Sequence, residues 1–233
     1  SYVVLDKEPL NLRKIKDSDT ENTINSKTLD NAVFRENHQR NFIINQLNNF
    51  SDDDLILIND LDEIPNLNNF IYKNKITIFK QKMIYYKLNL MQPNFNWSGS
   101  KICKKKHLKN PQWLRNVKSK KYPIWRLDTF FSNKKYYDIG FVENGGWHFT
   151  NIKSVEEIDH KMKNFLHHLE YEKSGLKIQD LKKMRDEKKI IYNYNIDQKG
   201  YKWSDDTKLE KIENKLLPKY IIDNLDKYKE WFD

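Results

Sequence analysis

The sequence predicts an α/β fold, because short aliphatic strands alternate along the chain with segments whose apolar residues recur at helical spacing. The run Leu55-Ile-Leu-Ile58 is bounded by polar turns, which is typical of a strand buried on both faces in a parallel sheet. After residue 150 the apolar residues follow the helical period instead. The chain has 233 residues and 38% apolar content, enough to form one core. We therefore expect a single domain, with a sheet-bearing part in 1–150 and a helical part in 151–233.

The first fifty residues predict one strand, one loop and one helix. Tyr2-Val-Val-Leu5 has the apolar character of a strand. Residues 7–30 are polar and aperiodic, which favours a long surface loop. A helix is expected from about residue 29 to residue 48. Its inward stripe is expected to contain Ile43, Ile44, Leu47 and Phe50.

Four further strands are expected in the middle of the chain. Their ranges are Ile76–Phe79, Met83–Leu90, Tyr122–Asp128 and Tyr136–Val142. In Met83–Leu90 the residues alternate, so one face is expected to be buried and the other wetter. The stretch Asn94–Gly99 is rich in turn residues and contains Trp97. This ring either packs in the protein or stacks on a sugar, and packing is the favoured interpretation.

Three helices are expected after residue 150. Ser154-Val-Glu-Glu157 has the pattern of a capping box, which satisfies backbone donors at the start of a helix. The buried face of that helix is expected to contain Val155, Ile158, Met162, Phe165, Leu166 and Leu169. A lysine-rich helix is expected from about Leu176 to Lys189, and a final one from Pro218, which suits a first helical turn. The final helix is expected to bury Ile221, Leu225, Tyr228 and Phe232.

Composition limits the possible environments and partners. No apolar run has the length of a membrane span and no signal peptide is visible, so we expect a chain that is soluble as given. Cys103 is the single cysteine, which excludes a disulfide within the chain. The formal net charge of +9 is compatible with nucleic acid, an anionic membrane or an anionic substrate as partner. Because the composition is biased toward lysine throughout, most lysines are expected to be solvated surface.

The acidic loop after Leu55–Ile58 is the strongest candidate for a functional site. Asp60, Asp62 and Glu63 follow the strand directly, and Pro65 ends regular pairing. Ligands of open α/β sheets bind at the carboxyl ends of the strands. Carboxylates two residues apart can converge on Mg²⁺ or Mn²⁺, and such an ion can bridge a diphosphate. The alternative is a solvated turn or a helix cap, and Glu63 is expected either to cap a helix or to support the metal ligands.

Four segments of the chain carry a resemblance to one family. They are Arg35–Arg40, Asn59–Pro65, Gly145–Thr150 with Ile158 and Lys161 behind it, and Pro218–Tyr228. They resemble, in order, the helix before the Asp-x-Asp strand, the Asp-x-Asp signature, the Gly-Trp-His segment and the C-terminal Pro-Lys-Tyr helix of glycosyltransferase family 17. Together the matches are more specific than any single one.

The resemblance implies a GT-A type fold, with a mostly parallel central sheet flanked by helices and a helical C-terminus. It also implies transfer of a sugar to a hydroxyl with inversion, assisted by Mn²⁺ or Mg²⁺. The family's characterised donor is UDP-N-acetylglucosamine and the acceptor is the β-mannose of the N-glycan core. The partners implied are thus a nucleotide sugar and a glycan, with no specific nucleic acid. The family's first strands, which help to hold the nucleotide, are expected to be missing from this chain or divergent.

The expected metal ligands are Asp60, Asp62 and His148. Asp62 is also expected to act at the reacting centre. His148 follows Gly145 and Gly146, which allow close backbone approach, and imidazole is a common ligand of divalent transition metals. Many GT-A type transferases, which the chain resembles, add a late histidine to the Asp-x-Asp metal. We therefore expect His148 to lie beside the two aspartates; the alternative is a packing residue held between Trp147 and Phe149 by a backbone hydrogen bond.

Two further roles have candidates. An inverting transfer needs a general base. Glu143 is the first choice, with Asp128 and Asp138 behind it. Arg115, in the lysine-rich segment Lys101–Lys121, is the candidate to neutralise a diphosphate. Arg40 is a second candidate through the resemblance of its helix, although its spacing from Glu36 also predicts a surface ion pair.

Two other classes of function are compatible with the sequence. A non-catalytic basic binding module on a degenerate transferase fold would explain the expected loss of strands and the lysine clusters. A nucleic-acid-binding protein needs a basic patch interleaved with aromatic residues. Lys101–Lys121 contains few aromatic residues, so this alternative is the weaker one. Metal-dependent hydrolysis of a nucleotide sugar would separate a transferase from both.

Overall fold

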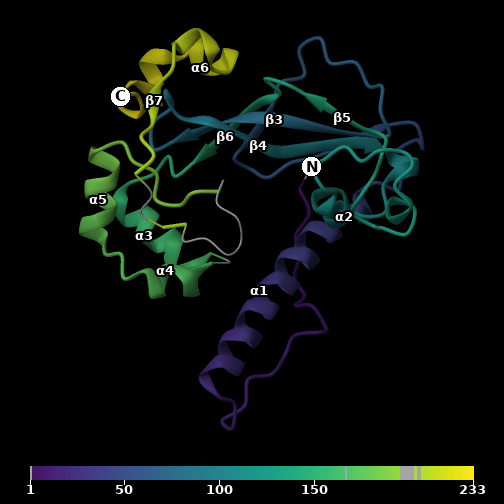
Figure 1. Cartoon of the computed structure of the whole chain (residues 1–233), viewed down its shortest axis with the longest axis horizontal. Helices are drawn as coiled ribbons and strands as arrows, with labels where there is room; N and C mark the ends of the chain where they lie inside the picture. Colours follow the sequence, from purple (N-terminus) through teal and green to yellow (C-terminus); the bar gives the residue numbers. More distant parts are fainter. Residues whose placement is uncertain (1, 166, 195–201, 204–205) are drawn as a thin grey trace. The chain divides into compact units, whose positions relative to one another are not determined.

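The computed structural model describes residues 2–165, 167–194, 202–203 and 206–233 (Figure 1). The chain divides into two compact units that interleave in sequence. The first unit contains Ser1–Ile58 and Ile102–Ile139, and the second contains Asn59–Lys101 and Gly140–Asp233. The expected single domain is neither confirmed nor contradicted by this division.

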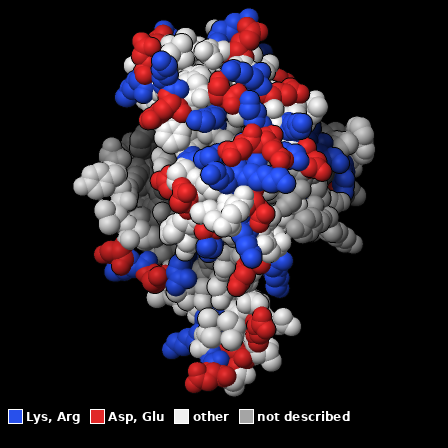
Figure 2. All heavy atoms as spheres, turned by 90° about the vertical axis from the view of Figure 1, so that its left-hand side faces the viewer, with Lys and Arg blue, Asp and Glu red and all other residues white. Residues whose placement is uncertain are grey.

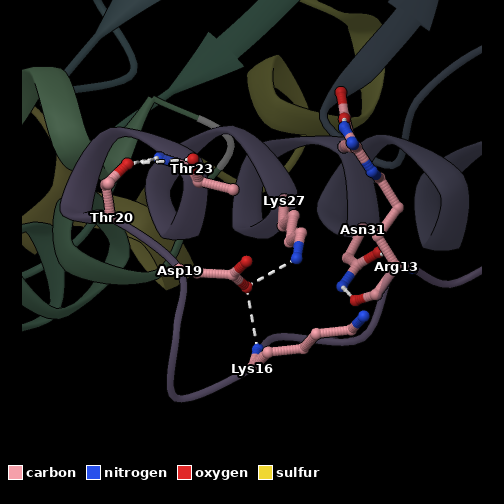
Figure 3. A network of polar contacts seen from close by, with 8 residues as sticks. Arg13, Lys16, Asp19, Thr20, Thr23, Lys27 and Asn31 are labelled. Atoms are coloured by element: carbon pink, nitrogen blue, oxygen red, sulfur yellow. Dashed lines mark hydrogen bonds and ion pairs between the residues drawn. The ribbon is translucent and has the colours of Figure 1, made fainter.

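The first unit is built around a long helix, α1 (Glu21–Phe42). Thr20 caps it, because its side-chain oxygen accepts a hydrogen bond from the backbone N–H of Thr23. The preceding segment lies alongside the helix, where the backbone of Lys16 and the Nζ of Lys27 both donate to Asp19 (Figure 3). The expected start near residue 29 is therefore wrong: the cap sits well upstream, inside the segment expected to be a loop.

Two other expectations for the N-terminal region are wrong. Residues 2–5 form no strand and are largely exposed, since they pair with no neighbouring strand. The helix continues after Phe42 only as a 3-10 turn, η1 (Ile43–Gln46). The expected inward stripe is solvent-facing, with Ile43, Ile44 and Phe50 exposed. The apolar spacing of these residues predicted a buried face, but no helix or strand in the described part of the first unit covers them.

The rest of the first unit consists mainly of short helices and loops, together with a strand at Leu55–Ile58 and the end of another strand at residues 102–104. η2 (Lys105–His107) precedes α2 (Pro111–Asn116), which Asn110 caps by accepting from the backbone of Trp113. Trp113 and Leu114 are buried. The strand expected at Tyr122–Asp128 is absent, and a 3-10 turn, η3 (Leu127–Thr129), lies there instead. Of the strand expected at Tyr136–Val142 only the end is formed, as β5 (Ile139–Val142).

The sheet is mixed and open, so the expected mostly parallel sheet is wrong. Its strands are β1 (Leu55–Ile58), β2 (Glu63–Pro65), β3 (Ile76–Tyr85), β4 (Leu90–Lys104), β5, β6 (Gly146–Thr150) and β7 (Glu210–Lys211). The order is β1-β4-β3-β6-β2, with β5 beside β3 and β7 beside β4. β3 and β6 are parallel, whereas β2 with β6 and β4 with β7 are antiparallel. The short turn between β3 and β4 leaves no room for the crossover that a parallel pair requires.

Two strand predictions are refined by the structure. β1 has the expected bounds, but it lies at the end of the strand order and only Ile56 and Ile58 are buried. A strand with one covered face alternates in this way, so burial on both faces is wrong. The two strands expected at Ile76–Phe79 and Met83–Leu90 are one strand, β3, which ends at Tyr85; Tyr86 then takes a positive φ of 62° in the turn.

Both faces of β3 are covered within the second unit. Met83 and Tyr85 contribute to a core with residues of α3 (Val155–Asn164), α4 (His168–Ser174) and α5 (Ile178–Asp186). Ile84 points to the other face, as alternation requires, and packs with Ile212, Leu217 and Ile221. The latter two belong to the C-terminal segments that include η4 (Asn214–Leu216), α6 (Lys219–Ile222) and η5 (Leu225–Trp231). The alternating strand therefore has a hydrophobic layer on each side.

The helices after residue 150 follow the sequence signals with shorter bounds. The predicted capping box of Ser154 and Glu157 is confirmed, with both reciprocal hydrogen bonds present. Val155, Ile158 and Met162 are buried as expected, but α3 ends at Asn164, and Leu166 lies outside the described residues. The final helix is broken: the short α6 follows Pro218, which makes no side-chain capping hydrogen bond, and a 3-10 helix continues from Leu225. Among the helices of the described ranges, none is long and apolar enough to cross a membrane.

Candidate site around Asp62 and His148

Strand pairing brings Asp62 and His148 together in the second unit, although they are far apart in the sequence. β2 pairs antiparallel with β6 so that Glu63 is opposite His148. The backbone N–H of Phe149 donates to the carbonyl of Asp62 at 2.8 Å. The Asp62 Oδ2 and His148 Nε2 atoms are 3.2 Å apart. His148 therefore lies beside Asp62 as predicted. Its adjacency to Asp60 and a metal role for the Asp62–His148 pair stay predictions.

The imidazole of His148 is held on three sides. Its ring stacks on the indole of Trp97, with centroids 5.0 Å apart and an interplanar angle of 20°. Its Nδ1 lies 3.1 Å from the sulfur of Met83, which is its partner in the parallel β3–β6 register. Its Nε2 faces Asp62. The side chain is buried, so its orientation is fixed by packing.

The Asp62 Oδ2 and His148 Nε2 atoms are placed so that they can share a proton or bind a cation between them. A carboxylate oxygen and an imidazole lone pair repel each other unless a positive species lies between them. Two ligands at right angles on an octahedral ion, each about 2.1 Å from it, are about 3.0 Å apart. The observed separation of 3.2 Å is close to that value. Oxygen and imidazole nitrogen are also the donor types that divalent ions such as Mn²⁺ accept.

Electrostatics keeps the Asp62 carboxyl ionised. Burial raises its pKa, but the hydrogen bond and charge of His148 and the charge of Lys161 outweigh burial, so the pKa lies below its usual value. The side chain is 41% exposed, which leaves room for a ligand to approach. Asp62 is therefore a charged oxygen donor at neutral pH.

Lys161 is the nearby cation that sequence reasoning did not assign to the site. It projects from α3, and its Nζ donates to the Oδ1 of Asn151 at 3.0 Å. Asn151 directly follows β6, is buried and takes a positive φ of 54°, so its position is tightly defined. Burial lowers the pKa of the Lys161 ammonium, while the charge of Asp62 acts in the opposite direction. The only sequence signal was its place behind the Gly-Trp-His segment.

Glu63 supports the site from beneath, and the expected helix-cap role is wrong because the residue begins β2. Its buried carboxylate accepts hydrogen bonds from the indole Nε1 of Trp97 at 2.7 Å and from the backbone N–H of Asp60 at 3.1 Å. Ser100 adds a third donor at 3.4 Å. Glu63 thus fixes the ring that stacks on His148. Trp97 is a packing residue within β4, as favoured from the sequence, and the turn expected there is wrong.

Three glycines are required by close contacts around these strands. A Cβ on Gly146 would lie 2.1 Å from the carbonyl oxygen of Ile64, and its φ of +129° is unfavourable for other residues. A Cβ on Gly145 would lie 2.7 Å from the carbonyl oxygen of Val142. A Cβ on Gly99 would lie 2.8 Å from the Glu63 carboxyl carbon. The predicted close backbone approach at the Gly-Gly turn is confirmed.

The other candidates are distributed over both units. Glu143 forms an ion pair with Lys80 at 2.7 Å and, within the described part of the chain, makes no direct contact with Asp62 or His148. Its role as a base stays a prediction, as does metal binding by Asp60. Arg40, Arg115, Asp128 and Asp138 belong to the first unit. Arg40 forms the expected ion pair with Glu36 at 2.8 Å, and Asp128 contacts Arg126 and Lys135.

The donor set supplied by the chain is small. In residues 2–165, 167–194, 202–203 and 206–233, no three His, Cys, Asp or Glu side chains are grouped to hold a metal ion. A cation held by Asp62 and His148 would take its remaining ligands from water or phosphate oxygens, which is common for Mg²⁺.

Comparison with protein-family models, curated proteins and solved structures finds no match, so the resemblance to family 17 has no independent support.

Proposed function

We propose that the second unit carries out metal-dependent glycosyl transfer from a UDP-sugar to a hydroxyl acceptor, with Asp62 and His148 as the protein ligands of Mn²⁺ or Mg²⁺. The observation that carries this proposal is the 3.2 Å separation of Asp62 Oδ2 and His148 Nε2. The two segments that resemble family 17 here are the partners of the β2–β6 pairing. A GT-A type arrangement, and N-acetylglucosamine as the donor sugar, belong to the same proposal through the resemblance.

Each side chain has a separate task in this proposal. A bound cation would supply charge that stabilises the departing diphosphate. Asp62 and His148 hold that charge in place, and Lys161 adds a fixed positive charge near Asp62. Trp97 keeps the imidazole in one plane, and Glu63 keeps Trp97 in one rotamer. Glu143 is the proposed base, because its exposed ion pair with Lys80 is weak enough for an acceptor hydroxyl to compete.

Surface charge does not favour nucleic acid as the ligand. On the face drawn in Figure 2, lysine and arginine side chains are interspersed with aspartate and glutamate. Several charges of the second unit are paired with each other, including Lys163 with Asp159 and Lys189 with Glu187. A nucleic-acid site needs basic side chains that are available to several phosphates along one track. The transferase proposal is therefore preferred.

Release of UDP from UDP-N-acetylglucosamine tests the proposed function. We expect turnover with Mn²⁺ and its loss in EDTA. Asp62→Asn and His148→Ala should each lower the rate about 100-fold or more, the loss typical of removing a group that stabilises developing charge. A UDP-sugar should also raise the melting temperature only when Mn²⁺ is present.

Two matched substitutions control for nonspecific effects. Asp226→Asn and His160→Ala remove an exposed acid and an exposed histidine from the same unit, and both should leave turnover unchanged. Turnover that survives EDTA, or that is equal in Asp62→Asn and Asp226→Asn, would contradict the proposal. Circular dichroism of each variant separates a lost site from a lost fold.

A further inference from the structure

The loop of residues 118–135 in the first unit has a closed and anchored base. The backbone N–H of Lys118 donates to the carbonyl of Lys134 at 2.7 Å. The indole Nε1 of Trp113 donates to the carbonyl of Asn133 at 2.8 Å, and its ring meets Tyr136 edge to face. Because Trp113 belongs to the buried face of α2, these contacts fix both ends of the loop to the unit. The conformation of the loop is therefore fixed at its base.

The tip of this loop exposes a concentration of large apolar side chains. Five residues carry it: Ile124, Trp125, Leu127, Phe130 and Phe131, which are 60%, 80%, 73%, 62% and 91% exposed. The tip is folded, since the Thr129 hydroxyl and backbone N–H both bond to the carbonyl of Arg126, and Tyr122 and Thr129 are buried beneath. Single exposed apolar residues are ordinary on protein surfaces, but a cluster of this size indicates a binding surface.

The same loop carries positive charge around the apolar tip. It contains six basic residues and one acid, Asp128. Arg126 and Lys135 both pair with Asp128, each at 2.6 Å. The exposed side chains of Lys118, Lys120, Lys121 and Lys134 have no acidic partner among the residues that the structure describes. Basic groups thus remain available beside the apolar side chains.

We propose that the loop of residues 118–135 docks the protein on an anionic lipid bilayer. Trp, Phe and Leu side chains enter the boundary between headgroups and acyl chains, and neighbouring lysines contact anionic headgroups. Nucleic acid fits less well, because Ile124 and Leu127 have nothing to contact on a phosphate backbone. A second copy fits less well, because two basic loops would repel each other. Docking of this kind needs no membrane-spanning helix.

Co-sedimentation with vesicles tests the proposal. The purified chain should bind phosphatidylcholine vesicles that contain phosphatidylserine, and bind at least about tenfold more weakly to phosphatidylcholine alone. Trp125→Ser with Phe131→Ser should lower binding to the anionic vesicles about tenfold or more, because the apolar insertion is lost. The control Tyr2→Ser with Leu10→Ser removes two large side chains of the same unit that are at least as exposed, and this variant should bind like the wild type.

A second pair of variants tests the electrostatic part. Lys120→Glu with Lys121→Glu should abolish the preference for anionic vesicles, whereas Lys7→Glu with Lys14→Glu makes the same change of charge elsewhere and should retain most of it. Absence of wild-type binding to anionic vesicles would overturn the proposal, as would equal losses in loop and control variants. Self-association that depends on Trp125 and Phe131 in the absence of lipid would also overturn it in favour of a protein interface.

Discussion

Asp62 and Asp128 both lie beside basic side chains, and their settings differ. Asp62 faces His148 at 3.2 Å, and the imidazole is stacked on Trp97 and fixed by the pairing of β2 with β6. Asp128 makes closer contacts, 2.6 Å to Arg126 and 2.6 Å to Lys135, in an exposed loop. Hydrogen bonds from Lys135 and Arg126 lower the pKa of Asp128, and His148 is the main cause that lowers the pKa of Asp62 against burial.

The difference teaches that contact distance alone does not identify a functional pair. Water and salt screen the exposed pairs of Asp128, and such pairs contribute little to stability. The partner of Asp62 is oriented by packing, so the geometry persists when a ligand replaces water. The Asp62–His148 pair is prearranged, partly exposed and connected to a buried network. We therefore expect substitutions in this pair, rather than in the pairs of Asp128, to change function.

The largest effect is expected where the backbone itself shapes the site. Gly146→Ala should lower the free energy of unfolding by about 3 kcal/mol or more, because strain at positive φ adds to a contact of 2.1 Å with the Ile64 carbonyl. Gly175→Ala is the control, since Gly175 also has a positive φ but open space around it, and should cost about 1 kcal/mol. Urea denaturation measures both. Equal costs would mean that β2 and β6 are not tightly paired.

The second-largest effect is expected when the lysine near each aspartate is removed. The rate of UDP release should fall for the Asp62 region and stay nearly unchanged for the Asp128 region. Lys161→Met should lower UDP release by about 100-fold, if Lys161 stabilises charge on the diphosphate. Lys135→Met, which removes a partner of Asp128, should leave the rate within about twofold of the wild type. The measurement is the initial rate at saturating Mn²⁺. A normal rate for Lys161→Met would restrict its role to holding Asn151.

The buried carboxylate of Glu63 should contribute more to stability than the exposed carboxylate of Asp128. Glu63→Ala leaves the indole N–H of Trp97 and the backbone N–H of Asp60 without an acceptor, which should cost about 2–3 kcal/mol of stability. Glu63→Gln keeps one carbonyl acceptor and should recover part of that loss. Asp128→Ala should lower the melting temperature only slightly, because its ion pairs are exposed and contribute little to stability. Comparable shifts for Glu63→Ala and Asp128→Ala would remove the contrast between the regions.

The smallest expected effect is a difference in salt response. Both aspartates have folded-state pKa values below the usual 3.8, so each stabilises the fold above about pH 4 and loses this contribution as pH falls through its folded pKa. In about 1 M salt, screening should return the pKa of Asp128 toward its ordinary value while that of Asp62 stays lowered. Carboxyl ¹³C titrations by NMR measure both. An equal salt response would show that Asp62 is as well solvated as Asp128.

Local signals predicted parts of this molecule well. The aliphatic run at Leu55–Ile58 forms a strand with the expected bounds, and Ser154 with Glu157 forms the expected capping box. Both depend on residues close in sequence. The adjacency of His148 to Asp62 was also predicted, from the glycines before His148, the affinity of imidazole for divalent metals and the resemblance to GT-A type transferases.

Features that depend on distant partners were not predictable. Tyr2–Leu5 and Tyr122–Asp128 are apolar enough for strands, but neither finds a neighbouring strand to pair with. The hydrogen bond from Trp97 to Glu63 depends on a close approach that Gly99 permits across strands, and no spacing in the sequence reports it. Lys161 reaches the site from α3, through packing that is set by the whole second unit.

Mn²⁺ binding measured by electron paramagnetic resonance tests the central claim most directly, because it needs neither substrate nor turnover. The wild-type chain should bind one Mn²⁺ at the Asp62–His148 pair. Asp62→Asn and His148→Ala should each weaken binding about tenfold or more, and Asp128→Asn should leave it unchanged. ¹⁴N coupling from an imidazole should be present in the wild type and absent in His148→Ala. Wild-type affinity retained in both Asp62→Asn and His148→Ala would contradict the assignment of this pair as the metal site.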